Sequence, residues 1–176
     1  MNIVKNILLY GIAVDSPEQN SKQAKVHFDR GVEFQEERKY DLAIEEYTEA
    51  IRLDPDYANA YLNRGNSYFK KGDYDQAITD FTEAIRLDPN YAEAYRLRGN
   101  SYFYKGDNDQ AITDYTETIR LYTNVYTNDE YAYYSRGLAH QAIGNYEQAI
   151  KDFETALKID PNYTEAKTNL EEALKN

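Results

Sequence analysis

Cysteine and tryptophan are absent from the sequence. The absence of cysteine excludes disulfides, thiolate metal sites and cysteine nucleophiles. Long apolar runs are missing too, because no stretch approaches the roughly 20 residues that a bilayer-spanning helix needs. Proline and glycine are scarce, with four and eight residues among 176. Nearly all of them fall at points where the pattern below requires a turn, a helix end or a close helix contact.

Basic residues are outnumbered, with 20 lysines and arginines against 31 aspartates and glutamates and a net charge of −11. A nucleic-acid-binding protein normally presents a basic face, so we expect no nucleic-acid partner. The same charge disfavours docking on an anionic membrane surface, so we expect no membrane partner either. The hydrophobic share of 41% is ordinary for a globular chain.

One pattern occurs four times along the chain. It is marked by the pairs Arg30-Gly31, Arg64-Gly65, Arg98-Gly99 and Arg136-Gly137, whose glycines lie 34, 34 and 38 residues apart. Each unit places aromatic residues and alanines at helical spacing around its glycine. The second unit shows this order as Tyr61, Gly65, Tyr68, Ala77, Phe81, Ala84 and Pro89. A fixed period of this length is typical of a stacked repeat protein.

This order resembles the tetratricopeptide repeat over about residues 24–163. Arg64 is a departure, because the family usually has leucine there. The resemblance implies an all-α fold, in which antiparallel helix hairpins stack as a right-handed α-solenoid, the tetratricopeptide superhelix. We divide the chain into an apolar N-terminal extension (1–15), repeats at 16–56, 57–90, 91–129 and 130–162, and a C-terminal capping helix (163–176).

Local signals predict where the helices begin and end. Ser16-Pro17-Glu18-Gln19 has the form of an N-cap followed by a first-turn proline, so the first helix should begin near Pro17. Gly72, Gly106 and Gly144 should form the turns between paired helices, where a positive φ is easiest for glycine. The capping helix should turn one apolar face inward. That face comprises Ala166, Leu170, Ala173 and Leu174.

Two segments allow more than one interpretation. Residues 1–14 are apolar and could cap the first repeat, dock into a neighbouring molecule, or act as a short secretory signal ending near residue 13. Four extra residues precede the fourth unit, within Tyr122–Asp129. A loop insertion that the fold tolerates is the favoured interpretation. The alternative is a change in pitch that widens the groove between the third and fourth units.

No pattern indicates an active site, so we expect no enzyme activity, no cofactor and no metal. His27 and His140 occupy aromatic core positions of their units, which favours a structural role. Asp80 and Asp114 lie on second helices, and we interpret them as part of solvated faces. The recurring arginines are interpreted as scaffold residues whose stems cover helix packing.

The resemblance implies that the first helices of successive units line a concave groove and supply the ligand contacts. Rigid aromatic side chains provide contact area at low entropic cost, and amides can pair with a peptide backbone. Three tyrosines outside the consensus positions, Tyr104, Tyr131 and Tyr134, are expected in the groove beside the insertion. Arg96 is the main cation expected there. The candidate peptide-binding residues are Asn63, Asn66, Phe69, Lys70, Arg96, Asn100, Phe103, Tyr104, Tyr131 and Tyr134.

A carboxylate clamp is not expected in this groove. Family members of that class hold a C-terminal carboxylate with lysines, asparagines and an arginine from three successive units. A carboxylate needs such cations to offset its desolvation. The five clamp positions can be aligned with this chain starting from the first unit or from the second unit. Each of these two registers matches the clamp at one position in five. The positions hold Phe28, Val32, Asn63, Glu93 and Leu97 in one register, and Leu62, Asn66, Leu97, Tyr131 and Ser135 in the other.

The sequence therefore predicts a cytoplasmic scaffold that binds an unidentified protein or peptide, with its strongest contacts between the third and fourth units. Truncating Tyr134 or Arg96 to alanine should weaken binding. The alternative is a structural module that self-associates weakly through residues 1–14 or the array ends, which light scattering would detect. In a third interpretation the array recruits a partner for a larger enzyme or regulator, although the capping helix favours a chain that ends naturally.

Overall fold

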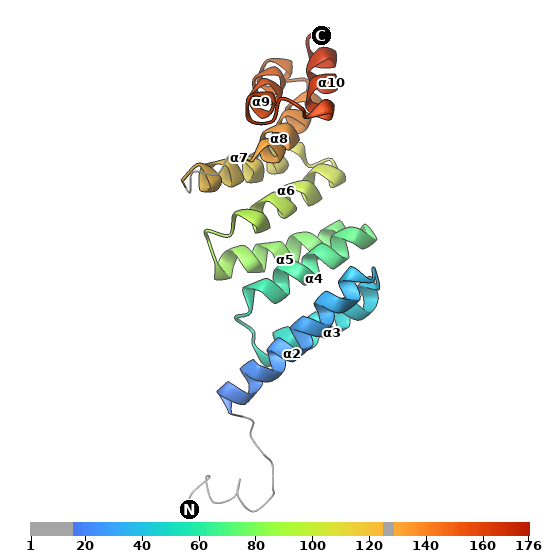
Figure 1. Ribbon diagram of the computed structural model, residues 1–176, viewed down its shortest axis with the longest axis vertical. Helices are drawn as coiled ribbons and strands as arrows, with labels where there is room; N and C mark the ends of the chain where they lie inside the picture. Colours follow the sequence, from blue (N-terminus) through green and yellow to red (C-terminus); the bar gives the residue numbers. More distant parts are fainter. Residues whose placement is uncertain (1–15, 125–128) are drawn as a thin grey trace, which may run out of the picture.

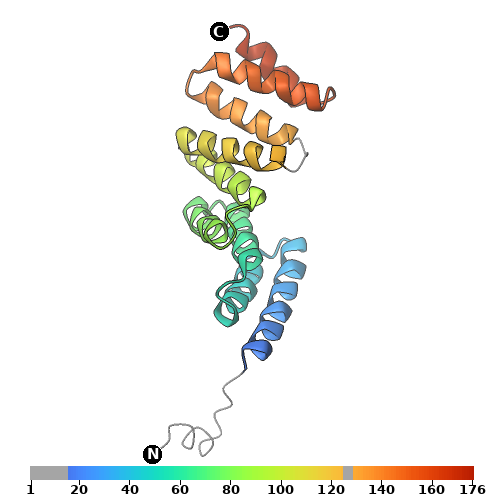
Figure 2. The ribbon, with the colours of Figure 1, turned by 90° about the vertical axis from the view of Figure 1, so that its left-hand side faces the viewer.

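The computed structural model describes residues 16–124 and 129–176, and every regular element in these ranges is a helix. The helices follow one another as four antiparallel hairpins and a final single helix, stacked into an elongated array with α2 and α10 at opposite ends (Figures 1 and 2). The hairpins are α2 (Pro17–Glu36) with α3 (Tyr40–Leu53), α4 (Ala58–Lys71) with α5 (Tyr74–Leu87), α6 (Ala92–Lys105) with α7 (Asn108–Asn124), and α8 (Glu130–Ala142) with α9 (Tyr146–Ile159), followed by α10 (Thr164–Ala173).

The predicted start of the first helix is confirmed. Ser16 Oγ accepts a hydrogen bond from the Gln19 amide at 3.2 Å, and Pro17 opens α2. This bond satisfies one of the amides that a helix leaves unpaired at its beginning. Asp129 caps α8 in the same way, because its Oδ1 accepts from the Ala132 amide at 3.2 Å.

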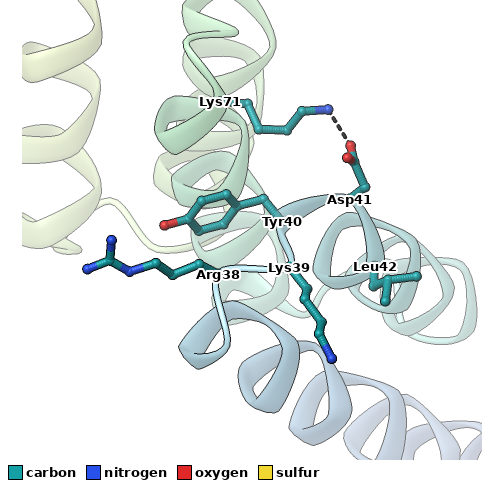
Figure 3. A pocket seen from close by; sticks show the side chains of 6 residues that line it. All are labelled: Arg38, Lys39, Tyr40, Asp41, Leu42 and Lys71. Carbon is teal, nitrogen blue, oxygen red and sulfur yellow. Dashed lines mark hydrogen bonds and ion pairs between the residues drawn. The ribbon is translucent and has the colours of Figure 1, made fainter.

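The turns between paired helices use a left-handed residue, as predicted. Gly72, Gly106 and Gly144 have φ values of 85°, 86° and 78°. In the first unit the same place is taken by Arg38, at φ 59°. Figure 3 shows its side chain pointing away from the ion pair that Lys71 forms with Asp41 across units one and two. The first turn therefore places a non-glycine residue where glycine is the favoured one.

Close contact between paired helices depends on the Arg-Gly glycines. A Cβ atom added at Gly65 would lie 2.8 Å from Cε1 of Phe81 on the partner helix, and one at Gly99 would lie 2.9 Å from Cε1 of Tyr115. Such distances leave no room for a methyl group without movement of the ring. The aromatic side chains that fill these contacts are fully buried, and they are Tyr47, Phe81, Tyr115 and Phe153.

The first helices of the hairpins form the inner layer of the array. Each of α2, α4, α6 and α8 contacts the next first helix, whereas no such contacts join the second helices α3, α5, α7 and α9 within the described ranges. Side chains that project from the inner layer therefore share one continuous surface. This surface is where the sequence places the candidate binding residues.

The extra residues before the fourth unit lengthen α7, which has 17 residues where α5 has 14. Residues 125–128 lie outside the described part of the chain. Arg136 of α8 still donates from Nη1 to Thr116 Oγ1 of α7 at 3.2 Å, although 20 residues separate them instead of the 16 between Arg98 and Thr82. The contact between units is therefore retained across the insertion, although the extra residues extend a helix as well as the connection that follows it.

The capping helix packs as predicted except at its end. Ala166 and Ala173 are buried, and Leu170 packs beside Phe153 of the fourth unit. Leu174 was predicted to share this face, but the prediction is wrong because the side chain is 63% exposed. The helix ends at Ala173, so Leu174 no longer follows the inward face. The predictions for residues 1–14 lie outside the described residues.

Candidate functional site

Each Arg-Gly arginine forms an ion pair with an acidic residue on the second helix of its own unit. Arg98 donates from Nε and Nη2 to the two carboxylate oxygens of Asp114, both at 2.8 Å. The equivalent pairs are Arg30–Glu46, Arg64–Asp80 and Arg136–Asp152. These arginines are scaffold residues, as expected, but they act through paired charges as well as through their stems.

The interpretation of Asp80 and Asp114 as solvated residues is therefore wrong. Asp114 is 3% exposed, as is Asp80, because both face the partner helix of the hairpin. Burial raises the pKa of both carboxyls, and the hydrogen-bonded guanidinium opposes that rise. Their role is to hold the hairpin together, since a bidentate pair fixes both distance and orientation.

The same arginines also reach back to the preceding unit. Arg64 Nη1 donates to Thr48 Oγ1 at 3.0 Å, and Arg98 Nη1 donates to Thr82 Oγ1 at 3.1 Å. One guanidinium thus joins both helices of its own hairpin to the hairpin before it. We call these contacts the arginine staples, and they recur at all three junctions between units.

The two histidines lie against acidic residues of their own hairpins. His27 Nδ1 is 2.7 Å from Glu46 Oε2, and His140 Nε2 is 4.0 Å from Asp152 Oδ2. Burial lowers the pKa of His140, and the nearby Arg136 adds to the effect while Asp152 opposes it. His140 Nδ1 is buried and has no hydrogen-bond partner. Both positions are consistent with packing roles.

Five predicted site residues line one concavity of about 190 Å³ between the third and fourth units. It opens beside the inner layer, between α6 and α8, and Tyr115 of α7 closes its base. We call it the tyrosine pocket. Its eight lining residues are Asn100, Phe103, Tyr104, Tyr115, Tyr131, Tyr134, Ser135 and Leu138.

Hydrogen bonds fix the walls of the tyrosine pocket. The Tyr115 hydroxyl donates to Asn100 Oδ1 at 2.8 Å, and Asn169 Nδ2 of the capping helix donates to the Tyr134 hydroxyl at 3.2 Å. Burial raises the pKa of the Tyr115 and Tyr134 hydroxyls, so both stay protonated at neutral pH. The amide of Asn100, predicted to pair with a peptide, thus gives its oxygen to the scaffold.

Tyr104 and Tyr131 present the accessible rings of the tyrosine pocket, with 63% and 40% of their surface exposed. Tyr134 differs, because its ring packs against Phe153 at 5.9 Å and Tyr163 at 4.8 Å between centroids. It is therefore a wall that the fourth unit and the capping helix support. Tyr104 and Tyr131 are the cleaner positions for testing ligand contact.

A group of rings extends the pocket toward the second unit. Tyr104 stacks on Tyr74 with centroids 5.6 Å apart and an interplanar angle of 18°. Phe69 and Phe103 meet Tyr104 edge-on, at 5.5 Å and 6.0 Å. These four side chains form what we call the aromatic cluster. It joins units two and three, and through Tyr104 and Phe103 it continues into the tyrosine pocket.

Arg96 lies beside the pocket and is already engaged within the chain. Its Nε donates to Glu93 Oε2 at 2.9 Å, and its guanidinium carbon lies 5.2 Å from the centroid of the Tyr131 ring. The hydrogen-bonded Glu93 raises the pKa of Arg96 against the opposing effect of burial. Arg96 thus holds Tyr131 of the fourth unit against the third.

The remaining predicted residues lie elsewhere on the array. Asn63 lines a separate concavity with Val32, Gln35, Glu36 and Tyr47, between the first two units. Lys70 is exposed, with its ammonium 5.9 Å from the Phe69 ring centroid. Asn66 is half-buried and lines neither concavity. The ten residues are therefore not one site.

Two contributors were missed at the sequence level. Tyr74 and Tyr115 occupy positions that the repeat explains as scaffold, yet Tyr74 stacks under Tyr104 and Tyr115 closes the pocket. The signal was present at position 74, where a tyrosine follows the Gly-Asp turn and begins the second helix. A pattern that treats all scaffold aromatics alike does not distinguish it.

In residues 16–124 and 129–176, no cluster of three or more histidine, aspartate or glutamate side chains is arranged to hold a metal ion. Among the helices of those same residues, none is both long and apolar enough to cross a bilayer.

Comparison with protein families gives a consistent match along the array. A model described as TPR repeat matches residues 33–72 and 65–103. Models described as tetratricopeptide repeat match residues 92–125 and 130–163. A comparison with curated protein sequences found no match.

Solved structures show the same architecture. A crystal structure of MamA protein is similar at 27% identity and a TM-score of 0.75, covering 88% of this chain and 87% of that chain. The first TPR of Spaghetti (RPAP3), bound to HSP90 peptide SRMEEVD, is 29% identical with a TM-score of 0.67 over 76% of this chain and 99% of that one. The second TPR of the same protein, bound to the same peptide, is 38% identical with a TM-score of 0.57 over 58% and 95%.

Proposed function

The chain belongs to the tetratricopeptide-repeat family of protein-interaction scaffolds, and on that premise we propose that it binds a peptide or protein segment along its inner layer of helices. The observation that carries this proposal is the tyrosine pocket, with Tyr104 and Tyr131 exposed at its mouth. Large exposed rings beside a concavity are the features that dominate binding energy at interfaces. The role is one of binding, and no chemical step is assigned to the chain.

The binding mode that we propose is not a carboxylate clamp. The two RPAP3 repeats were solved with a peptide that ends in acidic and apolar residues. In this chain two of the cations on the inner-layer helices are already engaged, and a third, Lys70, is exposed beside the Phe69 ring. Arg96 is paired with Glu93, and Lys25 is paired with Asp29 at 2.8 Å. A free carboxylate would have to displace these pairs to replace its lost hydration.

Alanine substitution at the exposed rings tests this function. Tyr104→Ala and Tyr131→Ala should each weaken binding of a peptide selected from a random display library by about tenfold, which is about 1.4 kcal/mol. Isothermal titration calorimetry would measure the affinity. Tyr40→Ala is the matched control, because Tyr40 begins α3 in the first unit and lines the separate pocket drawn in Figure 3, not the tyrosine pocket. Unchanged affinity in both pocket variants, with helicity intact by circular dichroism, would refute this placement.

Self-association through the array ends is a second candidate. It is favoured by two exposed aliphatic side chains near opposite ends, Val26 on α2 and Leu174 after α10. Exposed apolar surface of this kind can be covered by another copy of the chain. Light scattering over a range of concentrations decides between the two functions, because a mass that does not change with concentration removes this candidate.

A further inference from the structure

We propose that the tyrosine pocket takes an uncharged, proline-containing extended segment and seats one proline ring at its mouth. This inference rests on the proposed function and adds the chemical class of the partner. It follows from the charge of the lining, the size of the pocket, the geometry of the rings and the hydrogen bonds already made there.

The lining carries no formal charge. All eight side chains are aromatic, aliphatic, amide or hydroxyl groups. Beside the lining, Arg96 is paired with Glu93, Asp129 caps the start of α8, and the Glu165 carboxylate of α10 lies near Tyr134. A charged side chain entering the pocket would lose hydration without gaining a partner among the lining groups, which is unfavourable. A neutral ligand side chain avoids this cost.

The volume limits the ligand to one small group. At about 190 Å³ the pocket is smaller than the roughly 300–1,000 Å³ of sites that enclose a small molecule. It is large enough for a single side chain while the rest of the ligand continues along the surface. The aromatic cluster supplies that surface, because it runs from Phe69 to Phe103 at the edge of the pocket.

The rings offer a flat and well-supported face. Tyr104 is 63% exposed, yet Tyr74 stacks under it at 5.6 Å and Phe69 and Phe103 support its edges. Its ring is therefore held in place before the ligand arrives. Proline-rich segments dock on aromatic surfaces of this kind, because their polyproline II conformation is already formed and little entropy is lost.

The hydrogen bonds in the pocket also favour proline. Asn100 Oδ1, the amide acceptor of the lining, already accepts from the Tyr115 hydroxyl at 2.8 Å. Its second lone pair is buried with it, since Asn100 is 8% exposed. A ligand residue that packs a backbone N–H on the exposed ring faces would therefore lose water without gaining this acceptor, which is costly. Proline has no N–H, so it enters without this cost.

Four labelled peptides of equal length test the inference by fluorescence anisotropy. The first is a neutral repeat of Pro-Pro-Leu, the second has every proline changed to alanine, and the third and fourth have leucine changed to glutamate or lysine. We expect the first peptide to bind at least tenfold more tightly than each of the other three. Tyr104→Ala and Tyr131→Ala should remove this preference, whereas Tyr104→Phe, which keeps the ring, and Tyr40→Ala should retain it.

The inference is overturned if the alanine peptide binds as well as the proline peptide, or if either charged peptide binds more tightly. A parallel selection from a random display library separates this failure from failure of the proposed function. Selected peptides that depend on Tyr104 and Tyr131 but lack proline would sustain the function and overturn the inference. If selection yields no peptide that depends on these rings, both fail. Circular dichroism melts confirm that each variant is folded.

Discussion

Arg38 is the residue at which the first unit departs most from the other three. Its φ of 59° lies in the left-handed region, where glycine stands at the corresponding turns of the later units. A side chain in this conformation brings its Cβ close to the backbone, which costs about 1–2 kcal/mol. The Arg38 side chain is exposed and points away from the neighbouring ion pair (Figure 3), so packing does not offset the cost.

Replacing Arg38 with glycine should stabilise the protein. We expect the free energy of unfolding in urea to rise by about 1 kcal/mol, because the left-handed turn no longer carries a side chain. Gly106→Ala is the matched reverse experiment, since an added Cβ there meets no atom within 4 Å and any loss is conformational. Equal or lower stability in Arg38→Gly would show that the arginine has a stabilising contact.

His140 should make stability depend on pH. Burial lowers the pKa of His140 below the ordinary value of 6.5, because the charged ring loses hydration. In addition, no acceptor of the described residues lies within hydrogen-bond distance of Nδ1, so an N–H there would stay unpaired. The unfolded chain therefore takes up a proton more readily than the folded one as pH falls below about 6.5, and stability is lost in that direction. His140→Phe should lose less stability than the wild type between pH 7 and pH 5, measured by urea unfolding. Parallel pH profiles for the two proteins would contradict this.

At the scale of the helices, buried charge pairs decide how each hairpin closes. The carboxylate of Asp114 is almost completely buried and is held by two hydrogen bonds from Arg98. Such a pair contributes little net stability compared with an apolar contact of the same shape, but removing one partner leaves the other charge buried alone. The two residues should therefore behave as a unit.

A double-mutant cycle on this pair tests that coupling. Arg98→Met should lower the free energy of unfolding by about 3–5 kcal/mol, because the Asp114 carboxylate keeps its burial and loses its counter-charge. Adding Asp114→Leu should restore stability to within about 2 kcal/mol of the wild type. Chemical denaturation measures all four proteins. Additive losses in the double variant would show that the pair is not coupled.

The helices themselves could be predicted because each boundary has a local cause. Ser16 and Pro17 begin α2, and the glycines at 72, 106 and 144 supply the positive φ of the turns. The ion pairs could not be predicted in the same way. Asp80 and Arg64 are 16 residues apart on different helices, so their contact depends on how the two helices cross. Helical periodicity alone left Asp80 on a face that was interpreted as solvated.

The candidate site was predictable in part for the same reason. Tyr104 and Tyr131 were identified because they fall outside the repeated scaffold, and the structure brings them into one pocket. Asn63 was grouped with them because it occupies a groove position, but it lies a unit away. The position of a residue within a repeat predicts which layer it faces. It does not predict which side chains of neighbouring units will meet.

At the scale of the whole molecule, the array depends on its end. Each hairpin contacts its neighbours in sequence, and the outer apolar face of the fourth hairpin needs cover just as the inner faces do. The capping helix covers it with Ala166, Leu170 and Ala173, and it also holds Tyr134 through Asn169. Loss of this helix would therefore affect both stability and the wall of the tyrosine pocket.

A chain that ends at Asn162 should show this dependence. Exposing the face around Phe153 should lower the free energy of unfolding by roughly 3 kcal/mol, which corresponds to the burial of about one large and two small apolar side chains. Thermal unfolding followed by circular dichroism measures the loss, and light scattering detects aggregation. Leu174→Ala is the control, because that side chain is largely exposed and should change little. A shortened chain with unchanged melting would show that α10 does not act as a cap.

The arginine staples have a consequence for how such a molecule can grow. Arg64 joins Thr48 across the first junction, and Arg98 joins Thr82 across the second with the same atoms at nearly the same distance. A tandem duplication of residues 57–90 would therefore create a junction already suited to both of its neighbours. The coding sequence could lengthen by whole units, each adding one helix to the inner layer, without any new interface having to evolve.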